Sequence, residues 1–314
     1  MSKEWYAGEI RDTLKRASLV SKYGLFGFPP AILSVAITGG LHGKKANPNL
    51  PVTIEEQVQQ TVDAYNAGAV MVHIHTRDPQ NPDVMSNDPE SYMEINARIR
   101  EKCPDIIINN TMVGVRNFPI EGKASPPMQT SLTARPEVSS LDVMATPGYN
   151  NINGMTLSDL ENHLKNFDEY GIKPELECFS LGDLKNVEYA IKKGLLKPPY
   201  WIQILYNGFG NTPPVLEYLQ LAEKIIPDES LMSIIGIGAA QNVFMAYGLL
   251  MGHHVRVGLE DNVYYSKGEL AKSNAQMVER AVRVARDLGR PLATPAQARE
   301  MMGLGAPREY TFKK

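Results

Sequence analysis

Short apolar runs alternate with amphipathic segments along almost the whole chain. Eight of these runs have the length, the branched aliphatic content and the flanking turn residues of buried strands. They cover residues 32–38, 70–76, 106–112, 138–144, 174–180, 201–207, 233–238 and 253–260. Between most of them lies a longer segment in which apolar residues recur at the spacing of one helix face.

The amphipathic segments predict helices, and the first has clear signals at both ends. Thr53, with Glu56 three residues later, forms a capping-box pattern, and Gly68 suits the carboxyl-terminal cap. Helices are predicted over 53–69, 88–104, 156–171, 186–196, 213–227, 239–252 and 273–290. After the third strand the pattern is weaker and indicates only a short helix over 127–136.

Strands that alternate with helices predict a parallel sheet, because each helix returns the chain to the same end of the sheet. Eight strands close such a sheet, so the predicted fold class is α/β, a (β/α)8 TIM barrel with an N-terminal helical extension. An open, doubly wound sheet is the alternative. The extension covers residues 1–30 and is expected to pack on the barrel or on a neighbouring subunit. The barrel covers 31–305 and a tail covers 306–314, of which EYTFKK (309–314) is expected to be loose.

Composition adds limits on partners and compartment. The chain has 314 residues and a formal net charge of −3, which gives no reason to expect nucleic acid or an anionic membrane surface as a partner. No apolar run is long enough to span a bilayer. The two cysteines, Cys103 and Cys178, form neither a disulfide framework nor a zinc-finger pattern. We therefore expect a cytoplasmic protein.

Two histidines stand out in the second predicted strand, which reads VMVHIHT. Side chains alternate along a strand, so His73 and His75 share one face. In a TIM barrel the active site lies at the carboxyl ends of the strands, and two imidazoles there are a ready pair of metal ligands. The alternative is a pair of hydrogen-bonded core histidines.

The eighth strand supplies a candidate third ligand. It ends in GLEDN, and in a closed barrel only the first strand separates it from the second. Two histidines with Glu260 and an open position describe a catalytic zinc rather than a structural one. Asp261 follows at the mouth. Arg256, within the strand, must be paired or face the mouth, either as a pocket residue or in a structural ion pair with an acid such as Glu177.

Polar residues also mark the ends of the third and fourth strands. Thr111 ends the third strand, and Ser140 and Asp142 share one face of the fourth. Hydroxyl groups at these positions could orient a substrate oxygen. Arg77 and Asp78 follow the second strand, and we expect them to brace their loop through an ion pair.

Seven segments of the sequence together resemble the β-keto acid cleavage enzymes, whose best-known member is the 3-keto-5-aminohexanoate cleavage enzyme. The resemblance covers roughly residues 31–305, and the HxH and GLEDN blocks in combination are its specific part. The similar segments are ITGG, LPVTIEEQ, HIHTRD, PELECFSLG, GHHVRVGLEDN, KGELAKSNAQMVERA and GRPLATPAQAR.

The resemblance implies a zinc-dependent enzyme, usually a tetramer, that converts a β-keto acid and acetyl-CoA into acetoacetate and a new acyl-CoA. By matched position it implies that His73, His75 and Glu260 bind Zn²⁺. It further implies that Asp261 is the general base and that Arg256 stabilises developing negative charge. Thr111 and Ser140 fall where the family has a serine and a threonine near the substrate.

Two departures bear on the substrate. Leu41 stands where the aminohexanoate enzymes have a glutamate that meets the substrate amino group, which argues against the same amino substrate. Asp142 stands where they have an asparagine, and an acid there could pair with a cationic tail such as that of dehydrocarnitine. Lys44 and Lys45 would instead suit an anionic tail or the phosphates of CoA.

The sequence also allows three alternative interpretations of its function. An amidohydrolase-like hydrolase would place further histidines on the fifth and sixth strands, which have none. An acyl-CoA lyase of the type with HxH on the seventh strand would need the histidine pair elsewhere. A metal-binding barrel without catalytic activity is the third alternative.

Overall fold

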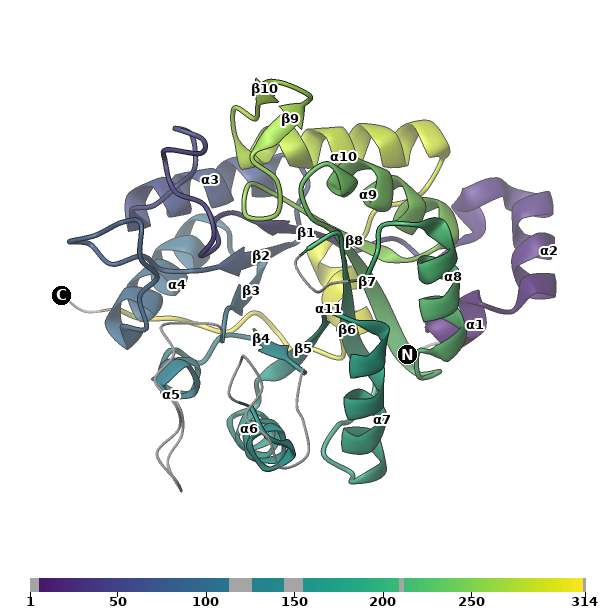
Figure 1. The fold of residues 1–314 in the computed structure, drawn as a ribbon, viewed down its shortest axis with the longest axis horizontal. Coiled ribbons are helices and arrows are strands. Elements are labelled where there is room, and N and C mark those ends of the chain that lie inside the picture. The colour runs from purple at the N-terminus through teal and green to yellow at the C-terminus, as the bar shows by residue number, and fades with distance from the viewer. Residues whose placement is uncertain (1–5, 113–125, 144–154, 209–211, 313–314) are drawn as a thin grey trace.

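The computed structural model describes residues 6–112, 126–143, 155–208 and 212–312. Within these ranges eight parallel strands close into a barrel in chain order, with β8 paired to β1 (Figure 1). The strands are β1 (Leu33–Ala36), β2 (Met71–Ile74), β3 (Ile107–Asn110), β4 (Val138–Asp142), β5 (Lys173–Cys178), β6 (Tyr200–Tyr206), β7 (Ser230–Gly236) and β8 (His254–Val257). The predicted TIM barrel is confirmed, and the open sheet is excluded.

Helices surround the barrel at the predicted places. They are α3 (Ile54–Asn66), α4 (Pro89–Lys102), α5 (Pro126–Ala134), α6 (Leu157–Tyr170), α7 (Leu184–Lys192), α8 (Leu216–Ile225), α9 (Ala240–Met251) and α10 (Asn274–Leu288). The capping box of α3 forms as expected, since Thr53 accepts from the Glu56 backbone and Glu56 accepts from that of Thr53. Four short elements were not predicted: η3 (Leu181–Asp183), α11 (Pro295–Met302) and the pair β9 (Tyr264–Ser266) and β10 (Glu269–Leu270).

The amino-terminal end of the barrel interior is apolar and closed. Met301 and Met302 of α11 pack against inward-facing side chains of the strands, among them Met71, Trp201 and Leu231. In Figure 1 this helix lies behind the barrel, on the far side from the viewer. The plug leaves only the carboxyl-terminal end of the barrel for a site that enters its interior.

Above this plug the barrel interior is polar, whereas most TIM barrels fill it with branched aliphatic residues. Glu175 of β5 is fully buried and accepts hydrogen bonds from Asn109 Nδ2 at 2.6 Å, Gln203 Nε2 at 2.6 Å and Trp201 Nε1 at 3.2 Å. Burial raises the pKa of Glu175, and these donors with Arg256 oppose the rise. The resulting network forms a rigid polar floor beneath the mouth.

The N-terminal extension is helical, as predicted, and docks on α8. It comprises α1 (Ala7–Ile10), α2 (Thr13–Tyr23) and η2 (Gly24–Gly27). Arg16 forms an ion pair of 2.5 Å with Glu223 of α8, and Arg11 donates to the backbone oxygen of Ile226 at 2.8 Å. In Figure 1 these helices project at the right of the barrel, beside α8.

The C-terminal tail is anchored at Arg308, just before the residues 309–314 that are expected to be loose. The Arg308 guanidinium donates to the backbone oxygens of Arg135, Pro136 and Gly171 at 2.8–3.0 Å, and its own backbone N–H donates to Glu137 at 3.0 Å. The segment is therefore tied to the ends of α5 and α6. Sequence patterns do not reveal such contacts between a side chain and distant carbonyl groups.

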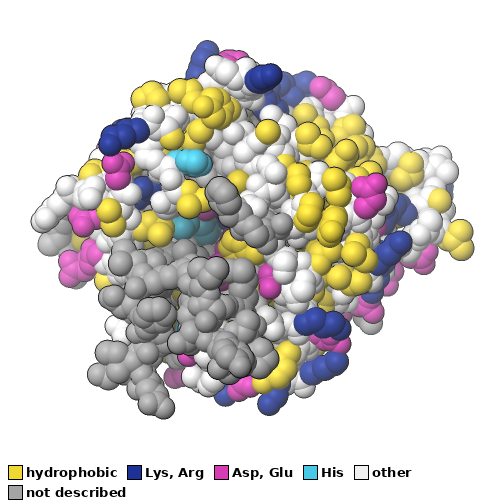
Figure 2. Space-filling view, viewed as in Figure 1, with side chains coloured by type: hydrophobic (Ala, Val, Ile, Leu, Met, Phe, Trp, Pro, Cys, Tyr) yellow, Lys and Arg dark blue, Asp and Glu magenta, His cyan; other side chains and the backbone are white. Residues whose placement is uncertain are grey.

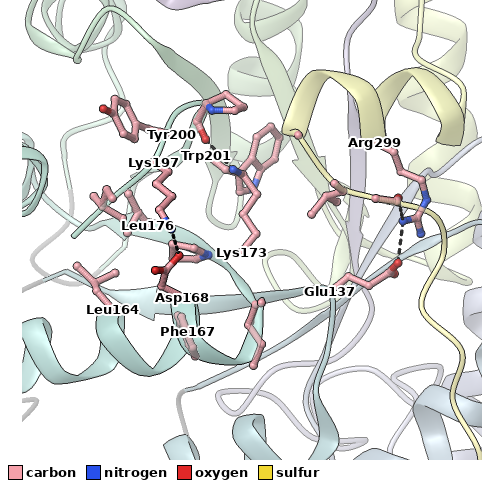
Figure 3. Close-up of a pocket in the computed structure, with 18 of the residues that line it drawn as sticks. Glu137, Leu164, Phe167, Asp168, Lys173, Leu176, Lys197, Tyr200, Trp201 and Arg299 are labelled. Carbon is pink, nitrogen blue, oxygen red and sulfur yellow. Dashed lines mark hydrogen bonds and ion pairs between the residues drawn. The ribbon is translucent and has the colours of Figure 1, made fainter. Parts of the chain in front are cut away.

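Figure 3 shows a cavity of about 310 Å³ at the amino-terminal end of the barrel. Its charged residues are engaged: Arg299 pairs with Glu137 at 2.7 Å, and Lys197 pairs with Asp168 at 2.6 Å. The apolar plug lies between this cavity and the carboxyl-terminal ends of the strands. Within the described ranges, no helix combines the length and the apolar character needed to cross a membrane.

Candidate metal centre and active site

The turn after β8 brings its acidic residues back toward the second strand. Gly258 has φ of +143°, and a Cβ there would lie 2.1 Å from the backbone oxygen of Ala36 in β1. Only glycine permits this approach. The Glu260 backbone N–H then donates to the same oxygen at 3.2 Å. This contact directs Glu260 across β1 toward the β2 histidines.

Three side-chain atoms converge at the barrel mouth. Nε2 of His73 and Nε2 of His75 lie 3.0 Å apart, and Oε1 of Glu260 lies 3.7 Å and 3.4 Å from them. Both histidines are buried, with 2 % and 5 % of their surfaces exposed. The period-two argument for a shared face and the barrel argument for Glu260 therefore place these residues together as predicted.

The geometry and chemistry of this trio fit a metal ion. A tetrahedral ion with ligands about 2.1 Å away holds them about 3.4 Å apart, close to the separations found here. Burial lowers the pKa of His73 well below its ordinary value, which favours the neutral imidazole that binds metal. Oε2 of Glu260 is buried and has no hydrogen-bond partner among the described residues, so it too is available to a cation.

Arg256 is the centre of a buried charge cluster. Its guanidinium donates to both carboxylate oxygens of Asp261 at 3.0 and 2.9 Å, to Oε1 of Glu260 at 2.7 Å and to Oε1 of Glu177 at 3.2 Å. The ion pair of Arg256 with Glu177 is confirmed, whereas its role as a pocket residue stays a prediction. Burial would raise the pKa of Glu260, but Arg256 and the two histidines outweigh it and lower that pKa.

The pKa of Asp261 is shifted upward, in the opposite direction from the pKa of Glu260. Burial raises the pKa of Asp261, and the adjacent Glu260 raises it further, although Arg256 opposes both. The bidentate contact with Arg256 fixes its carboxylate beside the metal ligands without making it one of them. A fixed carboxylate with raised basicity is suited to accepting a proton.

The polar residues of β3 and β4 lie on the inward face, as predicted. Asp142 is in register with Glu177, whose pKa is raised by burial and further by Asp142, with Arg256 opposing. Ser140 accepts a hydrogen bond from the Met112 N–H at 3.5 Å. Thr111, also buried, follows β3 next to the second strand. The structure thus brings Asp142 to the charge cluster through Glu177.

Two expectations for the loops change. Leu41 is 85 % exposed, so its side chain is not packed into the site. Among the described residues no ion pair joins Arg77 to Asp78: the Asp78 carboxylate accepts from the Gln80 N–H at 2.8 Å, while the Arg77 guanidinium turns toward the first loop. Lys44 is engaged with Glu56 at 2.7 Å, outside the mouth.

Sequence reasoning missed several neighbours of the site. Asn109 lies beside His73 in the strand register and raises the pKa of that ring by a side-chain hydrogen bond. Met85 places its sulfur 3.2 Å from Nδ1 of His75. Asn109 and Glu175 occupy inward positions of strands, so the alternation that singled out the histidines could have found them too. Nothing in the sequence indicated Met85, which lies in a loop.

Comparisons with known proteins find relatives that match most of the chain. A family model described as beta-keto acid cleavage enzyme matches residues 30–304. The 3-keto-5-aminohexanoate cleavage enzyme of Fusobacterium nucleatum subsp. nucleatum is 37 % identical over 281 residues, covering 87 % of this chain and 97 % of that protein. The 3-oxoadipate:acetyl-CoA acetyltransferase of Cupriavidus necator is 35 % identical over 286 residues, covering 88 % and 95 %.

Solved structures support the fold alone. The apo structure of ObcA superposes with a TM-score of 0.66 at 21 % sequence identity, covering 82 % of this chain and 66 % of that one.

Proposed function

Since this chain belongs to the β-keto acid cleavage enzyme family, we propose that it uses a metal-bound form of this site to cleave a β-keto acid with acetyl-CoA. The products are acetoacetate and a new acyl-CoA. The observation that carries the proposal is the convergence of His73, His75 and Glu260 next to the Arg256–Asp261 pair. Family membership also argues against the hydrolase and lyase readings.

The first half of the reaction needs a carbanion at C2 of the keto acid. A Zn²⁺ ion held by His73, His75 and Glu260 would act as a Lewis acid toward the keto oxygen and so acidify the C2 proton. Asp261 accepts that proton. Arg256, which already faces three carboxylates, offers a fixed positive charge to oxygens that gain negative charge.

The second half transfers the acyl group. The C2 carbanion attacks the acetyl-CoA thioester and releases the CoA thiolate. This thiolate attacks the original C3 carbonyl, and the C2–C3 bond breaks to expel the enolate of acetoacetate. The enolate takes back at C2 the proton that Asp261 holds, which completes acetoacetate and restores the base. Thr111 and Ser140 lie on the inward face, where their hydroxyl groups would orient a substrate oxygen.

We expect the purified protein to contain about one Zn²⁺ per chain, because two histidines and one glutamate form a single site. His75→Ala should remove most of this metal, and elemental analysis by mass spectrometry measures it. His42→Ala, which changes a histidine of the neighbouring loop, is the matched control and should keep the metal. Metal-free wild-type protein, or equal metal in His75→Ala, would contradict the zinc assignment.

Residues near the site also bear on the charge that the tail of the substrate carries. Asp142 lies at the charge cluster beside Glu177, whereas Lys44 is paired elsewhere. We propose that the tail carries a positive charge that pairs with Asp142.

The test measures kcat/KM for 3-dehydrocarnitine, 3-oxoadipate and a 3-oxo acid whose tail is uncharged. The value of kcat/KM should be highest for 3-dehydrocarnitine, whose tail is cationic. Asp142→Asn should lower the ratio of this value to that of the acid with the uncharged tail at least about tenfold, because a buried charge pair is lost. The uncharged acid is the internal control and should change little. A wild-type preference for the dicarboxylate would sink this assignment.

We further propose that the protein is a homo-oligomer, a tetramer in keeping with the family resemblance. Exposed apolar side chains cover the helices at the right of Figure 2, on the side where α2, α8 and α9 lie. They include Leu14, Phe26, Leu221, Ile225 and Val243. A second copy of the chain is the occupant that we assign to this surface.

Light scattering coupled to size-exclusion chromatography should give a mass above that of one chain. The double variant Leu14→Ser, Phe26→Ser should shift it downward, while Lys22→Ser on the same helix should not. A monomeric wild-type protein would refute the assignment.

A further inference from the structure

Arg77, two residues beyond His75, is a buried cation with only neutral acceptors. Its guanidinium donates to the backbone oxygens of Gly39, of His42 at 2.8 Å and of Pro82 at 3.2 Å, and to Oγ1 of Thr38 at 3.2 Å. Just 4 % of the residue is exposed. Within the described ranges, no carboxylate lies within ion-pair distance of it. A buried guanidinium that binds a set of carbonyl groups is a device for fixing backbone.

The backbone that Arg77 holds is in direct contact with Glu260, one of the three proposed metal ligands. A Cβ added at Gly39 would lie 2.5 Å from Cγ of Glu260 and 2.9 Å from its Cδ. The peptide of Gly39 therefore forms a wall behind the Glu260 side chain. Arg256 holds the same carboxylate by a hydrogen bond of 2.7 Å, so Glu260 is fixed by the wall and by this bond.

The next residue of the loop supports the second histidine. A Cβ added at Gly40 would lie 2.4 Å from Sδ of Met85, and this sulfur is 3.2 Å from Nδ1 of His75. One loop thus contacts Glu260 directly and His75 through Met85.

We propose that Arg77 is a positioning residue for the metal site: by holding the first loop it keeps Gly39 against Glu260 and Gly40 against Met85. This inference rests on the proposed function, since it concerns the same metal. It gives Arg77 a task that is separate from substrate contact. The task needs the planar fork of arginine, because an ammonium group cannot serve the same spread of carbonyl groups.

The experiment removes Zn²⁺ from the metal-loaded protein with a competing chromophoric chelator. Arg77→Met should weaken Zn²⁺ binding by about 10–100-fold, the range typical of residues that orient metal ligands. Arg77→Lys should fall between this variant and the wild type. Lys45→Met, an exposed cation of the same segment, is the control and should bind as the wild type does. Thermal melting of the metal-free proteins separates a general loss of stability from a loss of metal affinity.

Gly39→Ala tests the wall without touching the arginine, and so keeps the inference testable if Arg77→Met does not fold. It should weaken Zn²⁺ binding to a similar extent. Gly305→Ala is the matched control, because a Cβ there meets nothing within 4 Å. Wild-type affinity in folded Arg77→Met or in Gly39→Ala would overturn the inference alone. A wild-type protein that binds no Zn²⁺ would overturn the proposed function with it.

Discussion

Asp261→Asn is expected to lower kcat for acetoacetate formation by about 10³–10⁴-fold while the protein keeps its metal. General-base catalysis contributes up to about 10⁴-fold, and asparagine cannot accept the C2 proton. The side chain keeps its size and one oxygen for Arg256, so the site should remain folded. Asp261 is bound to Arg256 through both oxygens and is separate from His73, His75 and Glu260, the residues proposed to bind the metal.

Steady-state kinetics with metal analysis of the same preparation check this expectation. Asp287→Asn, an exposed aspartate paired with Arg286, controls for loss of a negative charge and should be unchanged. Glu260→Gln should lose metal as well as activity, which separates a ligand from a base. Turnover close to wild type in Asp261→Asn would remove Asp261 as the base.

Arg256→Met is expected to lower both stability and activity. Removal of one partner from a buried charge cluster costs about 3–5 kcal/mol, because the remaining charges are left uncompensated. Here Glu177, Glu260 and Asp261 would face one another without their shared cation. Activity should fall with the loss of the fixed positive charge near the reacting oxygens.

The stability loss in Arg256→Met should depend on pH. Without the arginine, burial and mutual repulsion raise the pKa of the carboxylates in the folded protein above their unfolded values. Stability is then retained at low pH, where these groups are protonated, and lost as pH rises through the raised values. The variant should therefore be destabilised more at pH 7.5 than at pH 5.5.

Urea unfolding of the metal-free proteins at both pH values measures this difference. Arg286→Met, at an exposed ion pair, is the control and should show a small effect at both. A metal-free Arg256→Met protein as stable as the wild type at pH 7.5 would contradict the role of this cluster.

The sequence allowed the barrel and the metal trio to be predicted because both depend on periodic patterns. Alternation placed His73 and His75 on one face, and closure of eight strands placed the end of β8 beside β2. Glu260 could thus be paired with histidines far away in the chain. These inferences need strand order and face, but no knowledge of loop conformation.

What the sequence did not allow depends on loops and short elements. Arg77 was expected to pair with its neighbour Asp78, but its partners are carbonyl groups of another loop, and carbonyl groups have no sequence signature. Helix α11 was missed because eight residues give too few turns for a clear apolar period. Leu41 and Asp142 were both expected to bear on the choice of substrate. Only Asp142 is buried near the charge cluster, whereas Leu41 is exposed.

The most direct test of the account is a carbon-labelling experiment with acetyl-CoA labelled in its acetyl group and an unlabelled β-keto acid. The account predicts label at C3 and C4 of acetoacetate and none in the new acyl-CoA, because the acetyl group joins C2 before the C2–C3 bond breaks. Unlabelled acetate with an unlabelled acyl-CoA would show direct thiolysis by CoA. That result, or hydrolysis without any acetoacetate, would contradict the proposed reaction.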